Sequence, residues 1–522
     1  MQIIANSNIE QKLFMLAIIF LPITHFSVSL PLVDRTISLI FVFLGMSISL
    51  YKVYKKNIVP DRFEKAAFCF LAVSLLWQVL CTVIGILEYS YYDIIYLEQM
   101  EKLRYLLQNL AQTGIRLEEL TAIKIWLGLR FVKDCVLNVL FTYGTSLWIY
   151  HLYKDYSTDT EKSSALVSHV TAAVSVLCLI LITYSVFVTG YLRGSKFCAD
   201  IISSINPLLY EINSFHGGWP PLLLPGRLRS LCAEPSFFGI ISVIIIFILF
   251  YKNLTTYHVF YGCLLSAFVM MTVMTRSRTA IPLFAGQGLL LLVYVLGMNR
   301  TYIKALLKII VVVSLSLFAG LYLMAGFKPV ETAAAQPAGQ RVQASTNVAS
   351  PDIKAAKEDL LKRSVPFADK ASFGSDMSRL NSTKAYFLTG LQNPVFGVGK
   401  GLSNAYAEAN YWKEDLWRDN LWSTFIRQKG VLRSPIPVLN HWSYETAQFG
   451  IVGLLIFLLP AFYLFRRFLR VFPNGVNMEL ACALIAYIGS NVAMFSNWAF
   501  LTYYIMTGIL LVLLPYKTER QE

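Results

Sequence analysis

The chain has 522 residues, of which 56% are hydrophobic and only 15% are charged, with a mean hydropathy of +0.56. This composition is too apolar for a soluble globular protein of this length and favours a membrane protein. Every backbone donor and acceptor must be satisfied inside a bilayer, so the apolar segments should be helices, which predicts an all-α polytopic fold. The net charge of +14 is explained by basic cytoplasmic loops and anionic headgroups, so nucleic acid is not an expected partner.

Apolar windows of about twenty residues predict about twelve transmembrane helices. They lie near residues 12–31, 36–53, 66–87, 133–152, 165–189, 236–251, 256–274, 280–298, 305–326, 446–465, 478–497 and 499–515. No small-residue cleavage site follows the first span, so it is expected to be a retained helix rather than a signal peptide.

Basic residues in the short loops predict the orientation of these helices. They follow the second, eighth and tenth spans: Lys52, Lys55, Lys56, Arg62 and Lys65, then Arg300 and Lys304, then Arg466, Arg467 and Arg470. Because short basic loops stay in the cytoplasm, both termini are expected to be cytoplasmic. Three segments then lie on the outer face: residues 88–132, 190–235 and 327–445.

This pattern divides the chain into three expected parts. Residues 1–326 form an N-terminal transmembrane bundle of about nine helices, residues 327–445 a large outer loop, and residues 446–522 the C-terminal helices. The loop opens with a flexible linker over residues 331–365, rich in Ala, Gln, Ser and Pro. Apolar residues at helical spacing between Leu97 and Leu110 predict an amphipathic helix that lies on the membrane surface or packs against the bundle.

Outer segments that are far apart in sequence bring ionisable residues to the same membrane face, where such residues are functional candidates. They are Arg227, Arg229 and Glu234 in GRLRSLCAEPSFFG, Arg276 and Arg278 in TRSRTAIP, and Arg379 in SDMSRLNSTKAYFLTG. The guanidinium group donates paired hydrogen bonds and keeps its charge, which suits it to binding a diphosphate. The alternative is that each arginine simply extends to the lipid headgroups.

A histidine at the membrane boundary can accept a proton from a sugar hydroxyl, although a lone histidine is more often structural. His441 lies directly before a predicted apolar helix, and Glu445 follows one helical turn later on the same face. Glu445 is expected to orient the imidazole ring or to act as the base itself. His216, in HGGWPP, is a second candidate.

Other kinds of site are not supported by the sequence. It contains no Walker loop, no G-x-G-x-x-G before a helix, no H-E-x-x-H and no paired C-x-x-C, so no cofactor and no metal are expected. GVGKG at residues 397–401 lacks the spacing of a phosphate-binding loop and predicts a tight turn. Cys198 and Cys232 bracket an outer loop and are candidates for a disulfide in an oxidising compartment.

Four motifs follow one another between the predicted spans. They are R-x-x-S-x-x-x-E-P from Arg227 to Pro235, the Ser277–Arg278 pair, R-x-x-x-x-x-A-Y-F-x-x-G-x-x-x-P-x-x-G-x-G from Arg379, and His441 before a G-x-x-G helix. In this order they resemble the O-antigen ligase and O-antigen polymerase superfamily, and the resemblance extends over roughly residues 165–470.

The resemblance implies a GT-C-like fold and a multi-pass protein of the bacterial inner membrane whose active site faces the periplasm. It further implies a metal-independent membrane glycosyltransferase with an undecaprenyl-diphosphate-linked donor. Arg227, Arg278 and Arg379 would bind the diphosphate, and His441, assisted by Glu445, would be the catalytic base. Arg229, Glu234, Arg276 and His216 remain secondary candidates.

The leading hypothesis is an O-antigen repeat-unit polymerase of lipopolysaccharide biosynthesis. The alternatives are an O-antigen ligase that uses lipid A core as the acceptor, a protein-glycosylating oligosaccharyltransferase, and a transporter or flippase for lipid-linked sugars. A transporter predicts polar residues in mid-helix and two repeated halves, and neither is evident. The expected partners are an undecaprenyl-diphosphate-linked oligosaccharide and membrane lipid, and the candidate protein partners are a chain-length regulator or a flippase of the same pathway.

Overall fold

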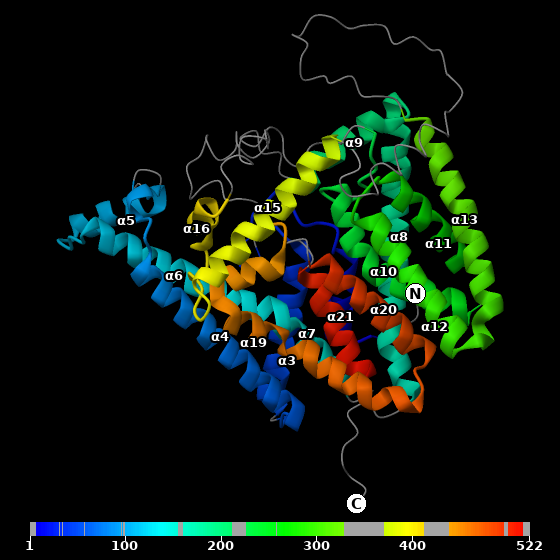
Figure 1. Ribbon diagram of the computed structural model, residues 1–522, viewed down its shortest axis with the longest axis horizontal. Helices are drawn as coiled ribbons and strands as arrows, with labels where there is room; N and C mark the ends of the chain where they lie inside the picture. Colours follow the sequence, from blue (N-terminus) through cyan, green and yellow to red (C-terminus); the bar gives the residue numbers. More distant parts are fainter. Residues whose placement is uncertain are drawn as a thin grey trace, which may run out of the picture.

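Figure 1 shows a computed structural model of the protein, an assembly of packed helices in which no β-strand occurs among the described residues. The structure describes residues 7–30, 32–33, 35–56, 58–95, 97, 100–154, 160–210, 226–256, 258–327, 370–411, 438–494 and 500–514. The predicted linker at 331–365 and the candidate His216 lie outside these residues.

The described residues form α-helices along most of the chain. In chain order these helices are α2 Ile9–Ile19, α3 Ile37–Lys56, α4 Arg62–Glu88, α5 Glu101–Gln112, α6 Glu119–Val139, α7 Thr145–Tyr153, α8 Thr160–Leu192, α9 Lys196–Leu209, α10 Pro235–Thr255, α11 Val259–Met274, α12 Ala280–Met298, α13 Ile303–Ala325, α15 Lys370–Gln392, α16 Ser403–Ala409, α19 His441–Val471, α20 Met478–Ala493 and α21 Phe500–Leu513. Short 3-10 helices lie at Tyr92–Ile94, Arg300–Tyr302 and Phe472–Asn474, and a π-helical segment lies at Leu140–Gly144.

The membrane-spanning character of the chain is confirmed by the length and composition of these helices. In the described part of the chain, seven helices are long and apolar enough to cross a membrane: α3, α4, α8, α10, α12, α13 and α19. Three shorter apolar helices, α11, α20 and α21, accompany them. Each predicted span therefore overlaps a helix, but fewer of the helices than predicted are long enough to cross the membrane by themselves.

The first predicted span, residues 12–31, is wrong in its extent. Helix α2 begins with a capping box between Asn8 and Gln11 and has only 11 residues. Pro22 follows its end and has no backbone N–H with which to continue the helical ladder. The chain then folds back toward α3, with the Phe26 amide donating to the Arg35 carbonyl at 3.0 Å.

The predicted span at 133–152 is also different in the structure. The helix already begins at Glu119 and reaches Tyr153 only through the π-helical segment. Within that segment Thr142 has non-helical dihedral angles, φ −98° and ψ −105°, and its hydroxyl donates to the Asn138 carbonyl. An inserted turn of this kind changes the helix direction, and α6 consequently continues outward past the bundle.

Helix α10 is the central element of the transmembrane bundle. It is apolar on all faces, and 83% of its most hydrophobic window is buried inside the protein, as expected for a helix surrounded by others. It contacts α8, α11, α12, α13, α20 and α21. At Gly239 a Cβ atom would lie 2.8 Å from the Ala280 backbone, so glycine permits the first turns of α10 and α12 to touch.

A second group of helices extends from this bundle. In Figure 1, α5 and α6 project to the left, with α15 and α16 beside them. The predicted amphipathic helix is α5, and Leu103 on its apolar face is buried in a cluster with Ile86 of α4 and with Leu127 and Phe131 of α6. Burying a leucine side chain contributes about 1.5–3 kcal/mol, so this packing holds α5 against α6.

Candidate functional site

The arginine-rich segment before α10 is bound to the turn between α11 and α12. The Arg227 guanidinium donates to the carbonyl oxygens of Thr275 at 3.1 Å and Arg276 at 3.3 Å. The Leu228 amide donates to the Met274 carbonyl at 2.9 Å. Two segments that were predicted separately from the sequence are therefore one structural unit.

The Ser277–Arg278 pair lies at the start of α12. The Ser277 hydroxyl oxygen accepts hydrogen bonds from the amides of Thr279 at 3.3 Å and Ala280 at 3.1 Å. It thereby satisfies donors that the first helical turn leaves open. Arg276 adopts a positive φ of 48°, which turns the chain sharply at this point, and Arg278 is half-buried.

Glu234 links the same unit to α15. It precedes α10 and accepts a hydrogen bond from the Ser236 hydroxyl at 2.7 Å. Burial raises the pKa of Glu234, opposed by this hydrogen bond and by the positive charges of Arg379 and Arg227. Because both guanidinium groups act on one carboxylate, Arg227 and the exposed Arg379 of α15 belong to the same electrostatic environment. We call Arg227, Arg278 and Arg379 the arginine unit.

Two other sequence-derived candidates are not part of this site. Arg229 is fully buried, lies 4.8 Å from the centre of the Tyr210 ring and donates to the Ala233 carbonyl at 3.4 Å, which indicates a structural role. The candidate disulfide is not present, because Cys198 and Cys232 are both free thiols. Cys198 packs against Gly190 of α8, whereas Cys232 is completely buried.

The predicted contact between His441 and Glu445 is present in the structure. Asn440 caps α19 by accepting a hydrogen bond from the Ser443 amide at 3.1 Å, so His441 is the first helical residue. The Nε2 atom of His441 lies 3.7 Å from Oε1 of Glu445. The two side chains are buried. The His441 ring also packs edge-on against the Phe457 ring, with 5.2 Å between the two ring centres.

The GVGKG segment brings a further charged residue to Glu445, and sequence reasoning missed it. Gly397, Gly399 and Gly401 all have positive φ angles, which confirms a tight turn. The turn is bound to α19, since the amides of Val398 and Gly399 donate to the carbonyls of Ala447 and Gln448, both at 2.9 Å. A Cβ atom at Gly397 would lie 2.4 Å from the Gln448 backbone, so this approach requires glycine.

Lys400 projects from this turn into the site. Its ammonium group lies 5.9 Å from the centre of the Tyr444 ring and 5.7 Å from that of Phe449. Burial alone would lower the pKa of Lys400, but Glu445, Tyr444, Cys135 and Asp134 together outweigh burial, and the pKa is raised. Lys400 therefore remains protonated in the neutral pH range.

Lys400 and Asp134 of α6 lie where two pockets adjoin, because both residues line both pockets. The first pocket, about 370 Å³, is mostly apolar and is formed by residues that include Leu21, Phe237, Ile240 and Leu501. The second, about 630 Å³, is more polar and is formed by residues that include Trp126, Arg130, Asn404 and Tyr444. Phe237 lies in the first turn of α10, three positions after Glu234, so the apolar pocket extends from the start of α10 to Lys400.

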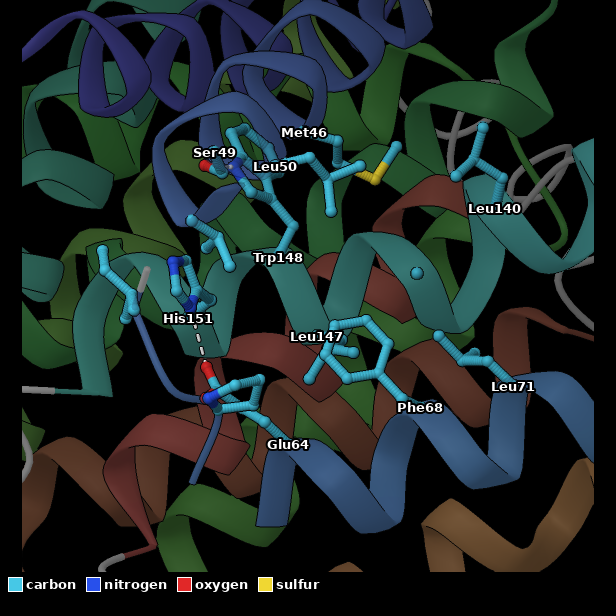
Figure 2. Close-up of a pocket in the computed structure, with 14 residues that line it drawn as sticks. Met46, Ser49, Leu50, Glu64, Phe68, Leu71, Leu140, Leu147, Trp148 and His151 are labelled. Atoms are coloured by element: carbon cyan, nitrogen blue, oxygen red, sulfur yellow. Dashed lines mark hydrogen bonds and ion pairs between the residues drawn. The ribbon is translucent and has the colours of Figure 1, made fainter. Parts of the chain in front are cut away.

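A separate pocket between α3, α4 and α7 contains none of the predicted site residues. Figure 2 shows apolar side chains such as Phe68 and Trp148 around it, and Glu64 and His151 at one end, 2.7 Å apart. Lys154 donates to the same carboxylate at 2.7 Å. This end lies near the basic residues that predict the cytoplasmic face. Within the described segments, no group of three His, Cys, Asp or Glu residues could hold a metal ion.

These features define a multi-pass helical membrane protein with a charged, partly buried site between an apolar and a polar pocket. Residues 262–426 match the family model described as O-antigen ligase, and this part of the chain is a domain of that family. The matched region includes Arg276, Arg278, Arg379 and Lys400, and it ends before His441. No curated protein matches the chain.

Proposed function

We propose that the protein is an O-antigen repeat-unit polymerase. It transfers a glycan from undecaprenyl diphosphate onto the next lipid-linked oligosaccharide at the periplasmic face of the bacterial inner membrane. The observation that supports this most strongly is the position of Lys400, within the O-antigen ligase domain and between an apolar and a polar pocket. A reaction between two lipid-linked glycans needs such a junction, where leaving group and attacking hydroxyl meet. A GT-C-like arrangement with about twelve membrane crossings belongs to the same proposal.

The arginine unit is the proposed binding site for the donor diphosphate. Negative charge grows on the diphosphate as its bond to the anomeric carbon breaks, and fixed cations stabilise that charge. Arg227, Arg278 and Arg379 supply such cations. Two of them, Arg227 and Arg379, interact electrostatically with Glu234. The carrier's apolar chain would lie along the apolar pocket or among the lipid-facing helices, in contact with membrane lipid.

His441 is the proposed base, with Glu445 orienting its ring. The acceptor hydroxyl gives its proton to the imidazole as its oxygen bonds to the anomeric carbon, and the diphosphate leaves with the electron pair of the broken bond. His441 is only 1% exposed, so this role requires the surrounding side chains to move when the acceptor binds. Lys400 helps by compensating the charge of Glu445.

Deletion of the gene, followed by gel analysis of lipopolysaccharide and of carrier-linked glycans, tests the proposal. Lipid A core that carries single repeat units supports a polymerase. Core without O-antigen, together with polymer retained on the carrier, supports the ligase instead. An unchanged ladder contradicts both reactions.

Complementation with variants then tests the residues. Removing a general base or a charge-stabilising donor typically lowers the rate about 10²- to 10³-fold. His441→Ala and Arg278→Ala should therefore fail to restore long chains. Arg300→Ala is the matched control and should restore them, because Arg300 is exposed beyond the opposite end of α12 from Arg278. Normal chain length with His441→Ala contradicts the assignment of the base.

A further inference from the structure

We infer that the polar pocket between α5, α6 and the Lys400 turn binds the sugar chain of the acceptor, with Trp126 as the surface on which a sugar ring stacks. This inference rests on the proposed function and adds to it the place where the second substrate lies. The pocket is formed largely by residues 95–134, which precede the matched O-antigen ligase domain.

The chemistry of the lining suits a carbohydrate. Trp126 and Tyr444 offer aromatic faces, on which the apolar face of a pyranose packs. Arg130, Asp134 and Asn404 carry planar polar groups that donate to or accept from sugar hydroxyls. The volume of about 630 Å³ lies within the range of about 300–1,000 Å³ that is common for small-molecule sites.

The distribution of charge argues against a lipid headgroup as the occupant. The lining contains both acidic side chains, Glu101 and Asp134, and basic ones, Lys102, Arg130 and Lys400. A site for anionic phospholipid would be dominated by basic residues. Mixed charges with two aromatic rings favour a ligand that is rich in hydroxyl groups.

The position of the pocket fits the second substrate. One end is formed by Lys400 and Asp134, which also line the apolar pocket beside the arginine unit. The walls belong to α5 and α6, which Figure 1 shows projecting beyond the transmembrane bundle. A hydrophilic glycan can therefore enter from the aqueous side. Its terminal hydroxyl then reaches Lys400 and Asp134, where the apolar pocket begins.

The walls are held by packing that does not depend on a ligand. Phe131 of α6 contacts the turn at Gly401, where a Cβ atom would lie 2.3 Å from its ring. Leu103 of α5, Leu127 of α6 and Leu402 share one buried cluster. The pocket is thus formed before the acceptor arrives, which reduces the conformational entropy that is lost on binding.

Binding can be measured without transfer. The probe is the oligosaccharide released by mild acid from the lipid fraction of the deletion strain, titrated into the purified full-length protein in lipid nanodiscs with no donor present. Trp126→Ala should weaken binding at least tenfold by calorimetry, and Trp126→Phe should stay within about threefold because a flat ring remains. Leu129→Ala is the control, since Leu129 is 70% exposed on the same helix and does not line the pocket.

Trp126 also packs against the buried cluster, so its alanine variant could fail to fold. Arg130→Ala keeps the test decisive, because Arg130 is exposed and its loss should weaken binding at least fivefold in a protein with the wild-type unfolding temperature. Unchanged affinity in folded Trp126→Ala and Arg130→Ala, or no binding by the wild type at millimolar probe, overturns the inference.

These experiments distinguish an error in the acceptor site from an error in the proposed reaction. If His441→Ala and Arg278→Ala keep full chain length while Trp126→Ala loses the probe, the site binds glycan and the reaction is wrongly assigned. If those two variants lose chain length while Trp126→Ala binds the probe normally, only the acceptor site is wrong.

Discussion

The charged form of Lys400 is favoured by the ionisable groups around it, chiefly Glu445, and this determines how Lys400 contributes to stability. The folded-state pKa of Lys400 is raised above its unfolded value of about 10.4. A lysine with a raised pKa contributes stability fully below the unfolded pKa and loses it as pH rises through the folded pKa. The contribution of Lys400 is therefore constant across the neutral range and falls only in strongly alkaline solution.

Replacement of Lys400 by methionine should destabilise the protein strongly. The substitution keeps much of the side-chain volume but removes the positive charge that acts on the buried Glu445, and removing one partner of a buried charge pair costs at most about 3–5 kcal/mol. The apparent unfolding temperature of the purified protein in detergent, followed by tryptophan fluorescence, measures this loss. Lys102→Met, at an exposed position of α5, should leave that temperature unchanged.

The double variant Lys400→Met/Glu445→Gln measures the interaction between the charges of Lys400 and Glu445. Once the carboxylate is neutral, the missing cation matters less, so the double variant should regain most of the lost stability. A double variant no more stable than Lys400→Met alone would show that the two charges do not interact.

Helix α19 is bent at Gly450 so that the glycine-rich turn can bind to it. Gly450 has φ 70° and ψ −175° inside the helix, and a Cβ atom there would lie 2.3 Å from the Val395 carbonyl oxygen. Directly after the bend, the Ile451 amide donates to the Pro394 carbonyl at 2.7 Å. The bend thus joins the segment before Lys400 to the helix that carries His441 and Glu445.

Gly450→Ala should therefore reduce stability by about 1–3 kcal/mol, the cost of a non-glycine residue in a sparsely populated backbone region. It should also lower transfer activity, because Lys400 and Glu445 would separate. Gly288→Ala in α12 is the matched control: no atom lies within 4 Å of its added Cβ. Alanine at an unstrained helical position stabilises by about 0.5–1 kcal/mol. Equal unfolding temperatures for the two variants would contradict the role of the bend.

The elements that sequence predicted best are those specified by local composition. Long apolar windows located α4, α10 and α13, and the four-residue spacing placed His441 beside Glu445. The end of α2 and the π-helical segment were missed, because hydropathy windows register neither the missing amide of Pro22 nor the turn at Thr142.

The parts of the site that were missed depend on contacts between distant segments. Lys400 interacts electrostatically with Glu445 because its turn binds to α19, more than forty positions later in the chain. Asp134 lies inside the predicted span 133–152, and only the packing of α6 against the turn of Lys400 shows that it lines both pockets. Arg229 has the same residue type as Arg227 but stacks on Tyr210, and only its tertiary surroundings reveal that difference.

At the scale of the whole molecule, the orientation in the membrane can be tested with reporter fusions. Alkaline phosphatase is active only outside the cytoplasm, so a fusion after residue 345 should be active, and one after Arg300 should be inactive. Basic residues next to Arg300 hold that loop inside. Active alkaline phosphatase in the fusion after Arg300 would contradict the proposed topology. The arginine unit would then face the cytoplasm, where it could not serve a periplasmic reaction.

The central position of α10 has a consequence for how the protein responds to its membrane. Bacteria alter their lipids with temperature, and helices that face lipid tilt or bend as the bilayer thins or thickens. Helix α10 is enclosed by other helices along most of its length, and it starts directly after Glu234. We therefore expect changes in the bilayer to displace the lipid-facing helices more than the charged groups at the start of α10.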